Sequence, residues 1–238
     1  MGGFFVVKNM KTVGIIGGLG PETTAKFYLE VLSSCFKTNK LNRPPMIVFN
    51  VPMRFDLERE IIVEAKGKNR LLPFLLDAAK HLEKGGADFI VIPCNTAHVF
   101  IEEVKKSVSI PVISIVEEAV KFLVEKNIGE VGFLATTQTV DSKLFDGHCV
   151  KKGIKINKPS PKNQFGVSSI VTKVLQGEHN ASDEQRLLKI VDSLDHSDCI
   201  LLACTDLQLL ISEHKNLKIF DTMKILADAT ARKILNEN

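Results

Sequence analysis

The sequence predicts an α/β protein built from two similar lobes, each a mostly parallel sheet flanked by helices. Short aliphatic runs alternate with helical patterns along the 238 residues, which is the order expected of parallel strands joined by right-handed crossovers. Two pairs of segments also repeat: ADFIVIPCNT (87–96) with SDCILLACTD (197–206), and VGIIGGLGPETT (13–24) with VGFLATTQTVDS (131–142). The two repeats have nearly equal offsets, 118 residues from Val13 to Val131 and 110 from Cys94 to Cys204. Two related halves explain this.

The strands are expected where aliphatic residues run without polar alternation, since a sheet covered on both faces by helices needs apolar residues on both faces. These runs are Val13–Ile16, Met46–Val51, Phe89–Ile92, Val112–Ile115, Val131–Leu134 and Ile200–Leu202. No linker marks a domain boundary, so we expect short crossings near Ser114 and Phe220. The prediction is an N-terminal lobe over 1–113, completed by 221–238, and a C-terminal lobe over 114–220.

The helices are expected where apolar residues recur three and four positions apart. These segments are Glu22–Phe36, Leu71–Lys84, Glu117–Lys126, Val140–Lys151, Glu184–Leu194 and Thr222–Leu235. The stretch Asn157–Gln164 contains two prolines and is expected to be a loop.

Composition excludes several classes of protein. The formal charge is only +3 and no dense basic cluster could follow a phosphate backbone. The sequence has no Trp and only one Tyr, so it offers no evident surface for stacking bases. Nucleic acid is therefore not an expected partner. Five scattered cysteines with no CxxC pair favour neither a disulfide framework nor a zinc site, and they fit a reducing cytoplasm. No apolar run approaches membrane-spanning length, so no membrane partner is expected either.

Two of the cysteines have the setting of reactive thiols. Cys94 and Cys204 each leave an aliphatic strand and enter a polar turn, where free backbone N–H groups lower a thiol pKa. Ligands of parallel sheets collect at these carboxyl ends of strands, so a small molecule could lie in a cleft between the two sulfurs. Cys35, Cys149 and Cys199 have no such setting and read as small buried hydrophobes.

Other polar groups near strand ends have both a structural and a functional interpretation. Gly17, Gly18 and Gly20 allow a tight turn or a close approach to a ligand, and the ATTQT run over 135–139 offers hydroxyls for a carboxylate or for helix capping. Arg54 and Arg59 could each bind a carboxylate through two parallel hydrogen bonds, or they could be surface charges in solvent. His98, four residues after Cys94, would support the site from behind.

These motifs resemble a known family. PCNTAH (93–98), ACTDL (203–207), GGLGPETT (17–24) and LATTQT (134–139) are similar to the Asp/Glu racemase superfamily, most closely its aspartate racemase and broad-specificity amino-acid racemase branch, from about residue 11 to the C-terminus. The resemblance implies two α/β lobes around a central cleft, no cofactor and no metal, a small amino-acid substrate and a homodimer.

Residue roles follow from the same resemblance. It makes Cys94 and Cys204 the two catalytic acid/bases, with Cys94 serving the D-enantiomer and Cys204 the L-enantiomer. The candidate substrate ligands are Asn95, Thr96, Thr137, Thr139, Thr205 and either Arg59 or Arg54, while Asp206, His98 and Gln164 would stand behind them. The predicted reaction is racemisation, in which one thiolate removes the Cα proton and the opposite thiol returns one.

Three residues depart from the family pattern and keep other functions open. Asp206 replaces a usual glutamate, Phe165 replaces a lysine found after the glutamine in aspartate racemases, and Ala203 replaces a common glycine. The alternatives are a cysteine-dependent dicarboxylate isomerase of the same superfamily and a non-catalytic protein that binds an amino acid.

Overall fold

Parallel strand pairing arranges the chain as two sheets of four strands. The structure is a computed structural model, and it describes residues 10–62, 66–194 and 196–237. The first sheet has the order β2-β1-β3-β4 and the second β6-β5-β7-β8, with every neighbouring pair parallel. The strands are β1 (Val13–Gly17), β2 (Met46–Asn50), β3 (Phe89–Val91), β4 (Val112–Ile113), β5 (Glu130–Ala135), β6 (Lys155–Asn157), β7 (Cys199–Ala203) and β8 (Lys218–Asp221). The identical order confirms the predicted α/β fold with two similar lobes.

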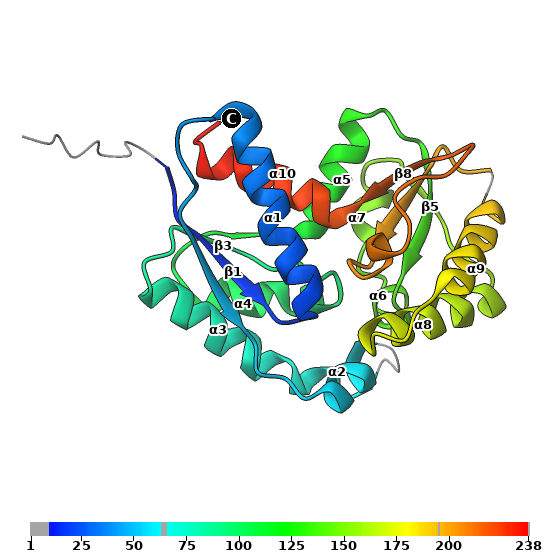
Figure 1. Cartoon of the computed structure of the whole chain (residues 1–238), viewed down its shortest axis with the longest axis horizontal. Coiled ribbons are helices and arrows are strands. Elements are labelled where there is room, and N and C mark those ends of the chain that lie inside the picture. The colour runs from blue at the N-terminus through cyan, green and yellow to red at the C-terminus, as the bar shows by residue number, and fades with distance from the viewer. Residues whose placement is uncertain (1–9, 63–65, 195, 238) are drawn as a thin grey trace, which may run out of the picture.

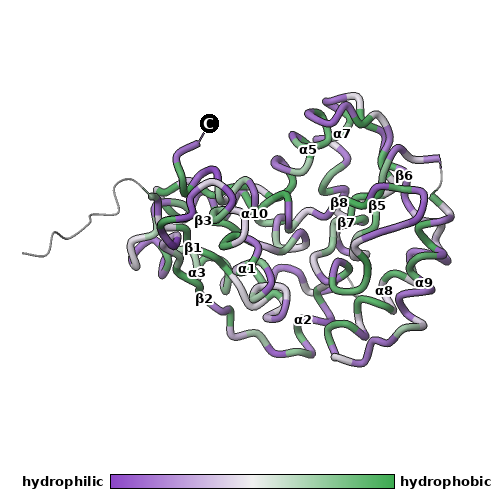
Figure 2. The backbone as a smooth tube through the Cα atoms, turned by 45° about the horizontal axis from the view of Figure 1, so that its top comes forward, coloured by the Kyte–Doolittle hydropathy of each residue, from purple (hydrophilic) through white to green (hydrophobic). Residues whose placement is uncertain are grey.

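Helices cover both faces of each sheet (Figure 1). They are α1 (Pro21–Thr38), α2 (Phe55–Ile62), α3 (Leu72–Lys84), α4 (Ile101–Ser107), α5 (Ile115–Glu125), α6 (Thr137–Asp141), α7 (Asp146–Val150), α8 (Pro161–Leu175), α9 (Ala181–Asp192) and α10 (Thr222–Ile234). Along the outer helices α8 and α9, hydrophobic and hydrophilic residues alternate (Figure 2), which is the pattern of a helix with one buried face. No helix of the described part of the chain is long and apolar enough to cross a membrane.

Three apolar clusters hold the elements together. One cluster is shared by both sheets, because alternate residues of β1 and β5, such as Ile15 and Phe133, pack with α1, α5, α7 and α10. The residues that point the other way form separate clusters, with α3 and α4 beneath the first sheet and with α8 and α9 beneath the second. The shared cluster fixes the two sheets relative to each other and thereby positions their strand ends.

The last helix crosses from one sheet to the other. Asp221 ends β8 and caps α10 by accepting from the backbone N–H of Lys224 at 2.6 Å. Helix α10 then runs back against α1 (Figure 1), and Ser34 of α1 donates to Asp228 of α10 at 2.6 Å. The lobe boundaries predicted at 113/114 and 220/221 stay a prediction, and residues 1–9 and 238 of the predicted first lobe lie outside the described residues.

Some predicted elements are wrong in detail. The segment 140–151 is not one helix, because Lys143 adopts a φ of 52° between α6 and α7. The predicted loop Asn157–Gln164 contains the end of β6 and the start of α8, where Pro161 stands in the first helical turn and Ser160 accepts from the Asn163 N–H at 3.3 Å. The strand predicted to reach residue 115 ends at Ile113, since α5 begins at Ile115.

Candidate active site

The two cysteines of the repeated motifs lie at equivalent places in the two sheets. Cys94 comes three residues after β3 and Cys204 directly follows β7, and each of these strands neighbours the first strand of its own sheet. Only 5% of Cys94 and 4% of Cys204 is exposed. Because all strands are parallel, both thiols stand at carboxyl ends, which is where α/β sheets bind ligands.

The thiols interact electrostatically although they come from different sheets. Burial raises the pKa of Cys94 to about 12, backbone N–H groups of Ala97 and Thr96 oppose that shift, and the charges of Asp206 and Glu58 add to it. Burial, then Asp206, raises the pKa of Cys204 well above its usual value, and Cys94 itself contributes. Both groups are therefore neutral thiols at neutral pH in the ligand-free protein, and neither is a resident thiolate.

Asp206 lies directly beside the second thiol. The Cys204 Sγ–H donates to Asp206 Oδ2 over 3.5 Å, and 6% of the aspartate is exposed. Burial raises the pKa of Asp206 to about 6, the hydrogen bond from Cys204 opposes this, and the charge of Glu22 on α1 adds to it. The negative charge of Asp206 thus raises the pKa of both thiols. Thr205, between Cys204 and Asp206, is buried as well.

Three hydroxyls join the strand ends of the two sheets. Thr96, after β3, lies 3.0 Å from Thr136 Oγ1 and 3.3 Å from Thr139 Oγ1, and Thr136 donates to Thr139 at 2.9 Å. Thr136 also caps α6 by accepting from the Thr139 N–H at 3.2 Å. The first 3-10 turn after Cys94 therefore contacts the helix start of the second lobe.

Asn95 is held by one end of its amide. Its Nδ2 donates to Thr222 Oγ1 at 2.8 Å, and Thr222 in turn donates to the carbonyl of Leu202 at 3.1 Å. This chain of donors fixes the amide orientation, so Oδ1 points the other way. That oxygen is buried and has no hydrogen-bond partner among the described residues. A buried acceptor without a partner is a group that a ligand could satisfy.

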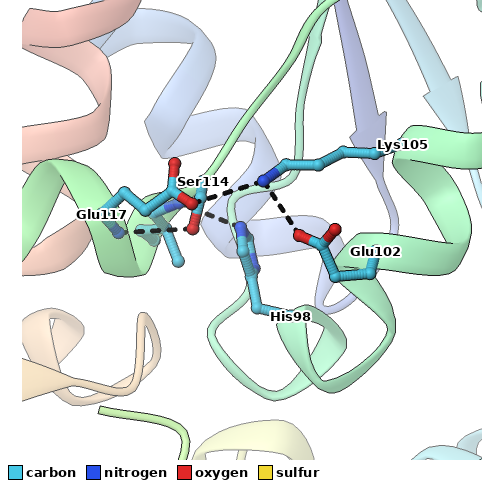
Figure 3. A network of polar contacts seen from close by, with 6 residues as sticks. His98, Glu102, Lys105, Ser114 and Glu117 are labelled. Carbon is cyan, nitrogen blue, oxygen red and sulfur yellow. Dashed lines mark hydrogen bonds and ion pairs between the residues drawn. The ribbon is translucent and has the colours of Figure 1, made fainter. Parts of the chain in front are cut away.

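His98 supports the Cys94 loop from behind, and Figure 3 shows it together with Lys105, Ser114 and Glu117. Its Nε2 accepts from the Ile115 N–H at 2.9 Å, so the proton is on Nδ1, which lies 2.8 Å from the Cys94 carbonyl. Burial, and after it the charge of Lys105, lowers the pKa of His98 to about 4. Neutral His98 thus ties the cysteine loop to the start of α5, and no atom of its ring is left for a ligand. Lys105 bridges Glu102 and Glu117 nearby, at 3.0 and 3.3 Å.

The remaining predicted site residues differ in their exposure and in their partners. Arg54 forms two hydrogen bonds with Asp56 and its side chain is 84% exposed, while Arg59 on α2 is also exposed. Thr137 Oγ1 lies 2.6 Å from Ser168 Oγ on α8. Gln164 donates to the Ala135 carbonyl at 3.0 Å, next to the hydroxyl cluster, and its buried Oε1 has no partner among the described residues.

Sequence reasoning missed Glu58 and Thr222, and it named Thr136 only as part of the ATTQT run over 135–139. Glu58 on α2 is 4% exposed, and its Oε1 has no hydrogen-bond partner among the described residues. Burial raises the pKa of Glu58 to about 7, and the charges of Asp206 and Glu22 add to the shift. The signal in the sequence was weak: Glu58 stands three positions before the fully buried Ile61, on the apolar side of a short charged helix.

A hollow of about 520 Å³ lies between the lobes beside α6. Lys68, Asn69 and Arg70 line it from the segment that precedes α3, and Gln138, Asp141 and Ser142 line it from α6 and its end. Arg70 is paired with Glu60. Within the described ranges no group of three or more His, Cys, Asp or Glu side chains could hold a metal ion.

Comparison with known proteins gives a consistent family. The family model described as Asp/Glu/Hydantoin racemase matches residues 16–230. The broad specificity amino-acid racemase RacX of Bacillus subtilis (strain 168) is 29% identical over 229 residues, which cover 94% of this chain and 98% of RacX.

Solved structures match the fold over nearly the whole chain. A putative Asp/Glu racemase from Yersinia pestis superposes with a TM-score of 0.81 at 24% identity, covering 95% of this chain and all of that one. The aspartate racemase of Picrophilus torridus gives a TM-score of 0.80 at 24% identity, covering 96% of this chain and 95% of that one. At these identities the two structures support the fold alone.

Proposed function

Because the chain belongs to the Asp/Glu/hydantoin racemase family, a family of isomerases, we propose that it interconverts L- and D-amino acids by proton transfer between Cys94 and Cys204. The observation that carries the proposal is the pairing of the thiols. They come from equivalent strand ends of two sheets, both are buried, and the charge on Cys94 affects the pKa of Cys204. Similarity to the RacX racemase over 94% of this chain supports the same reaction class.

The reaction needs one base and one acid on opposite faces of Cα. One cysteine, as thiolate, takes the proton from Cα, and the electron pair of the broken C–H bond moves toward the substrate carboxylate. The other cysteine then donates its proton to the opposite face. Each turnover leaves the first sulfur as thiol and the second as thiolate, so the return reaction restores the starting state.

The protein must supply the stabilisation that a cofactor would give to the carbanion. Backbone N–H groups of Thr96 and Ala97 already interact with the Cys94 sulfur and lower its pKa, so they favour its thiolate. The hydroxyls of Thr96 and Thr139 are candidates to hold the substrate carboxylate as it gains negative charge. The unpaired Oδ1 of Asn95 is suited to accept from the α-ammonium group.

Thiolate formation is linked to substrate binding in this proposal. The pKa of Cys94, about 12, leaves little thiolate in the free protein, and an α-ammonium group placed between the sulfurs would lower that pKa by charge attraction. The substrate thus helps to create the base that attacks it. We also propose a homodimer in the cytoplasm, as implied by the family resemblance.

Solvent deuterium exchange tests the proposal. Purified protein in D₂O is incubated with single enantiomers of a broad amino-acid panel, and mass spectrometry with chiral chromatography follows label at Cα and inversion. We expect both to occur together. Cys94→Ser and Cys204→Ser should each abolish inversion, and each should remove exchange with a different enantiomer, because each sulfur faces one side of Cα.

Cys149 and Cys199 provide matched controls. Both are buried cysteines of the shared core, and Cys199 begins β7, the strand that Cys204 directly follows. Cys149→Ala and Cys199→Ala should keep exchange. Inversion that survives in either serine variant, or full loss of exchange in both alanine controls without unfolding, would contradict the two-thiol mechanism. Maleate in the same panel detects the dicarboxylate isomerase, and saturable binding without label uptake identifies a binding protein.

A further inference from the structure

Thr222 lies where the second sheet passes into the helix that crosses to the first lobe. It is the first residue of α10 and directly follows Asp221, the last residue of β8. Asp221 is in register with Leu202 on β7, the strand that Cys204 directly follows. The side chain of Thr222 is completely buried at this place, beside the strand end from which the second thiol emerges.

The hydroxyl of Thr222 has one proton and contacts two groups. The carbonyl of Leu202 lies 3.1 Å from Oγ1, and a carbonyl can only accept. The hydroxyl must therefore donate to Leu202, which leaves its oxygen to accept from the second neighbour, the amide of Asn95 at 2.8 Å. The end of the amide that faces Thr222 is thus the donor, Nδ2. A backbone carbonyl of β7 decides in this way how the amide of Asn95 is turned.

No other contact fixes the amide of Asn95. Within the described residues, Thr222 is the only hydrogen-bond partner of the Asn95 side chain, and Oδ1 is buried without a partner. If the amide were reversed, Oδ1 would face the oxygen of Thr222 with no proton between them, because that proton is on the side of Leu202. The reversed amide is therefore disfavoured by Thr222 alone.

The two hydrogen bonds of Thr222 also connect the motifs of the two thiols. Asn95 directly follows Cys94, and Leu202 stands two positions before Cys204. We infer that Thr222 is a positioning residue of the active site, which keeps Oδ1 of Asn95 turned toward the α-ammonium group of the substrate. This inference rests on the proposed racemase function and adds to it a residue that acts through Asn95.

The orientation of the amide matters because the substrate is charged at its α-nitrogen. Oδ1 carries negative partial charge and accepts from an ammonium group, whereas Nδ2 carries two protons and repels it. The ammonium group keeps its charge before and after the proton leaves Cα, so the bond to Asn95 holds the bound substrate and the transition state alike. Loss of such a uniform interaction raises KM and leaves kcat nearly unchanged.

The test compares two buried threonines of α10 in the full-length protein, with the best substrate of the amino-acid panel. Thr222→Val removes the hydroxyl and keeps the shape of the side chain. Thr230→Val is the matched control, because Thr230 is equally buried and its hydroxyl donates to the Leu226 carbonyl of its own helix at 2.7 Å. Cα deuterium uptake gives kcat and KM for each variant.

We expect the two variants to differ in KM. Thr222→Val should raise KM by about tenfold to a hundredfold, the range for a hydrogen bond to a charged group, and should change kcat by less than about threefold. Thr230→Val should leave both parameters within about twofold, because it loses only a bond inside the helix. An unchanged KM in Thr222→Val overturns the inference while the racemase proposal stands.

Two further variants distinguish positioning from a purely structural role. Thr222→Ser restores the hydroxyl and should return KM to within about threefold of wild type. Asn95→Ala removes the amide through which Thr222 acts, so Thr222→Val added to it should raise KM little further, whereas independent effects would multiply. Failure of the serine to restore KM, or multiplied effects in the double variant, overturns the inference.

A measurement on the wild-type protein needs no variant to fold. In the isotopically labelled protein, nuclear Overhauser contacts are expected between the side-chain amide protons of Asn95 and the side chain of Thr222, both without and with substrate. Amide protons of Asn95 that contact the substrate instead of Thr222 overturn the inference.

Failure of the racemase proposal has a different signature. If the wild-type protein exchanges the Cα proton of no amino acid, the racemase proposal is refuted, and calorimetric binding of the same panel then tests Thr222. Amino-acid binding that Thr222→Val weakens and Thr222→Ser restores supports the positioning role. Equal binding by the wild type and Thr222→Val overturns it, and so does the absence of amino-acid binding.

Discussion

Replacing the buried carboxyl of Glu58 by an amide should make the protein more stable at alkaline pH. Burial, Asp206 and Glu22 raise the pKa of Glu58 from 4.5 to about 7. The folded state therefore holds this proton more tightly than the unfolded chain, and ionisation of Glu58 opposes folding. The cost is absent below the unfolded pKa, grows as the pH rises from 4.5 to about 7, and is complete above that value.

The size of the effect follows from proton linkage. With these two pKa values, ionised Glu58 costs about 3 kcal/mol at about pH 8 and less than about 1 kcal/mol at about pH 5. Glu58→Gln removes this titration, so its free energy of unfolding relative to wild type should rise by about 2 kcal/mol between those two pH values. For a chain of this size that corresponds to about 4–8 °C in Tm. Relief of Asp206 from the same charge acts in the same direction.

Thermal unfolding of both proteins at the two pH values checks this prediction, with Glu103→Gln as an exposed control. His98 titrates in the same range with the opposite sign, because its lowered pKa makes stability fall as the pH drops from 6.5 toward 4. Since His98 is present in every variant, only the difference between variants is informative. A difference in Tm between Glu58→Gln and wild type that does not change with pH would refute the reasoning that Glu58 is buried and charged against neighbouring acids.

Three further predictions concern the frame of the site. In the proposed mechanism kcat/KM rises with pH as a thiol ionises. Asp206→Asn should shift this rise to lower pH, because the charge of Asp206 raises the pKa of Cys204. An unchanged pH profile of kcat/KM would contradict this. His98→Ala should cost about 2–4 kcal/mol in urea unfolding, since it leaves the Cys94 carbonyl and the Ile115 N–H unpaired, and a loss under about 1 kcal/mol would exclude that role. Gly18→Ala should cost about 1–3 kcal/mol, because Gly18 has a φ of 86° and a Cβ would lie 2.7 Å from the Val51 backbone N; Gly147→Ala, with open space around it, should cost nothing.

The fold was largely predictable because its strands are fully buried. Continuous aliphatic runs such as 200–202 admit few other interpretations, and each of the two proposed catalytic cysteines follows a buried strand. Prediction failed where one local signal had two meanings. Pro161 was interpreted as a loop residue, yet a proline suits the first turn of a helix, and α8 begins there.

The site was only partly predictable because its surroundings are non-local. Cys94 and Cys204 could be paired through their repeated motifs, but nothing near Glu58 in sequence shows that its charge interacts with Asp206 and Cys94. A carboxylate in the charged run FDLERE resembles a solvated helix face. Thr137 and Thr136 are equally plausible hydroxyls in sequence, and only the direction of helix α6 turns Thr136 toward Thr96 and Thr137 toward Ser168.

The triangle of Thr96, Thr136 and Thr139 has a consequence for affinity. In the free protein each hydroxyl already has its neighbours as partners, so an arriving carboxylate must trade existing bonds for new ones and gains little net energy from the exchange. Weak binding of both enantiomers suits the proposed racemase, because its product is the mirror image of its substrate and must be released from the same site. The same exchange would give up a hydrogen bond that links the residues after β3 to those after β5, while the shared apolar cluster still holds the two sheets together.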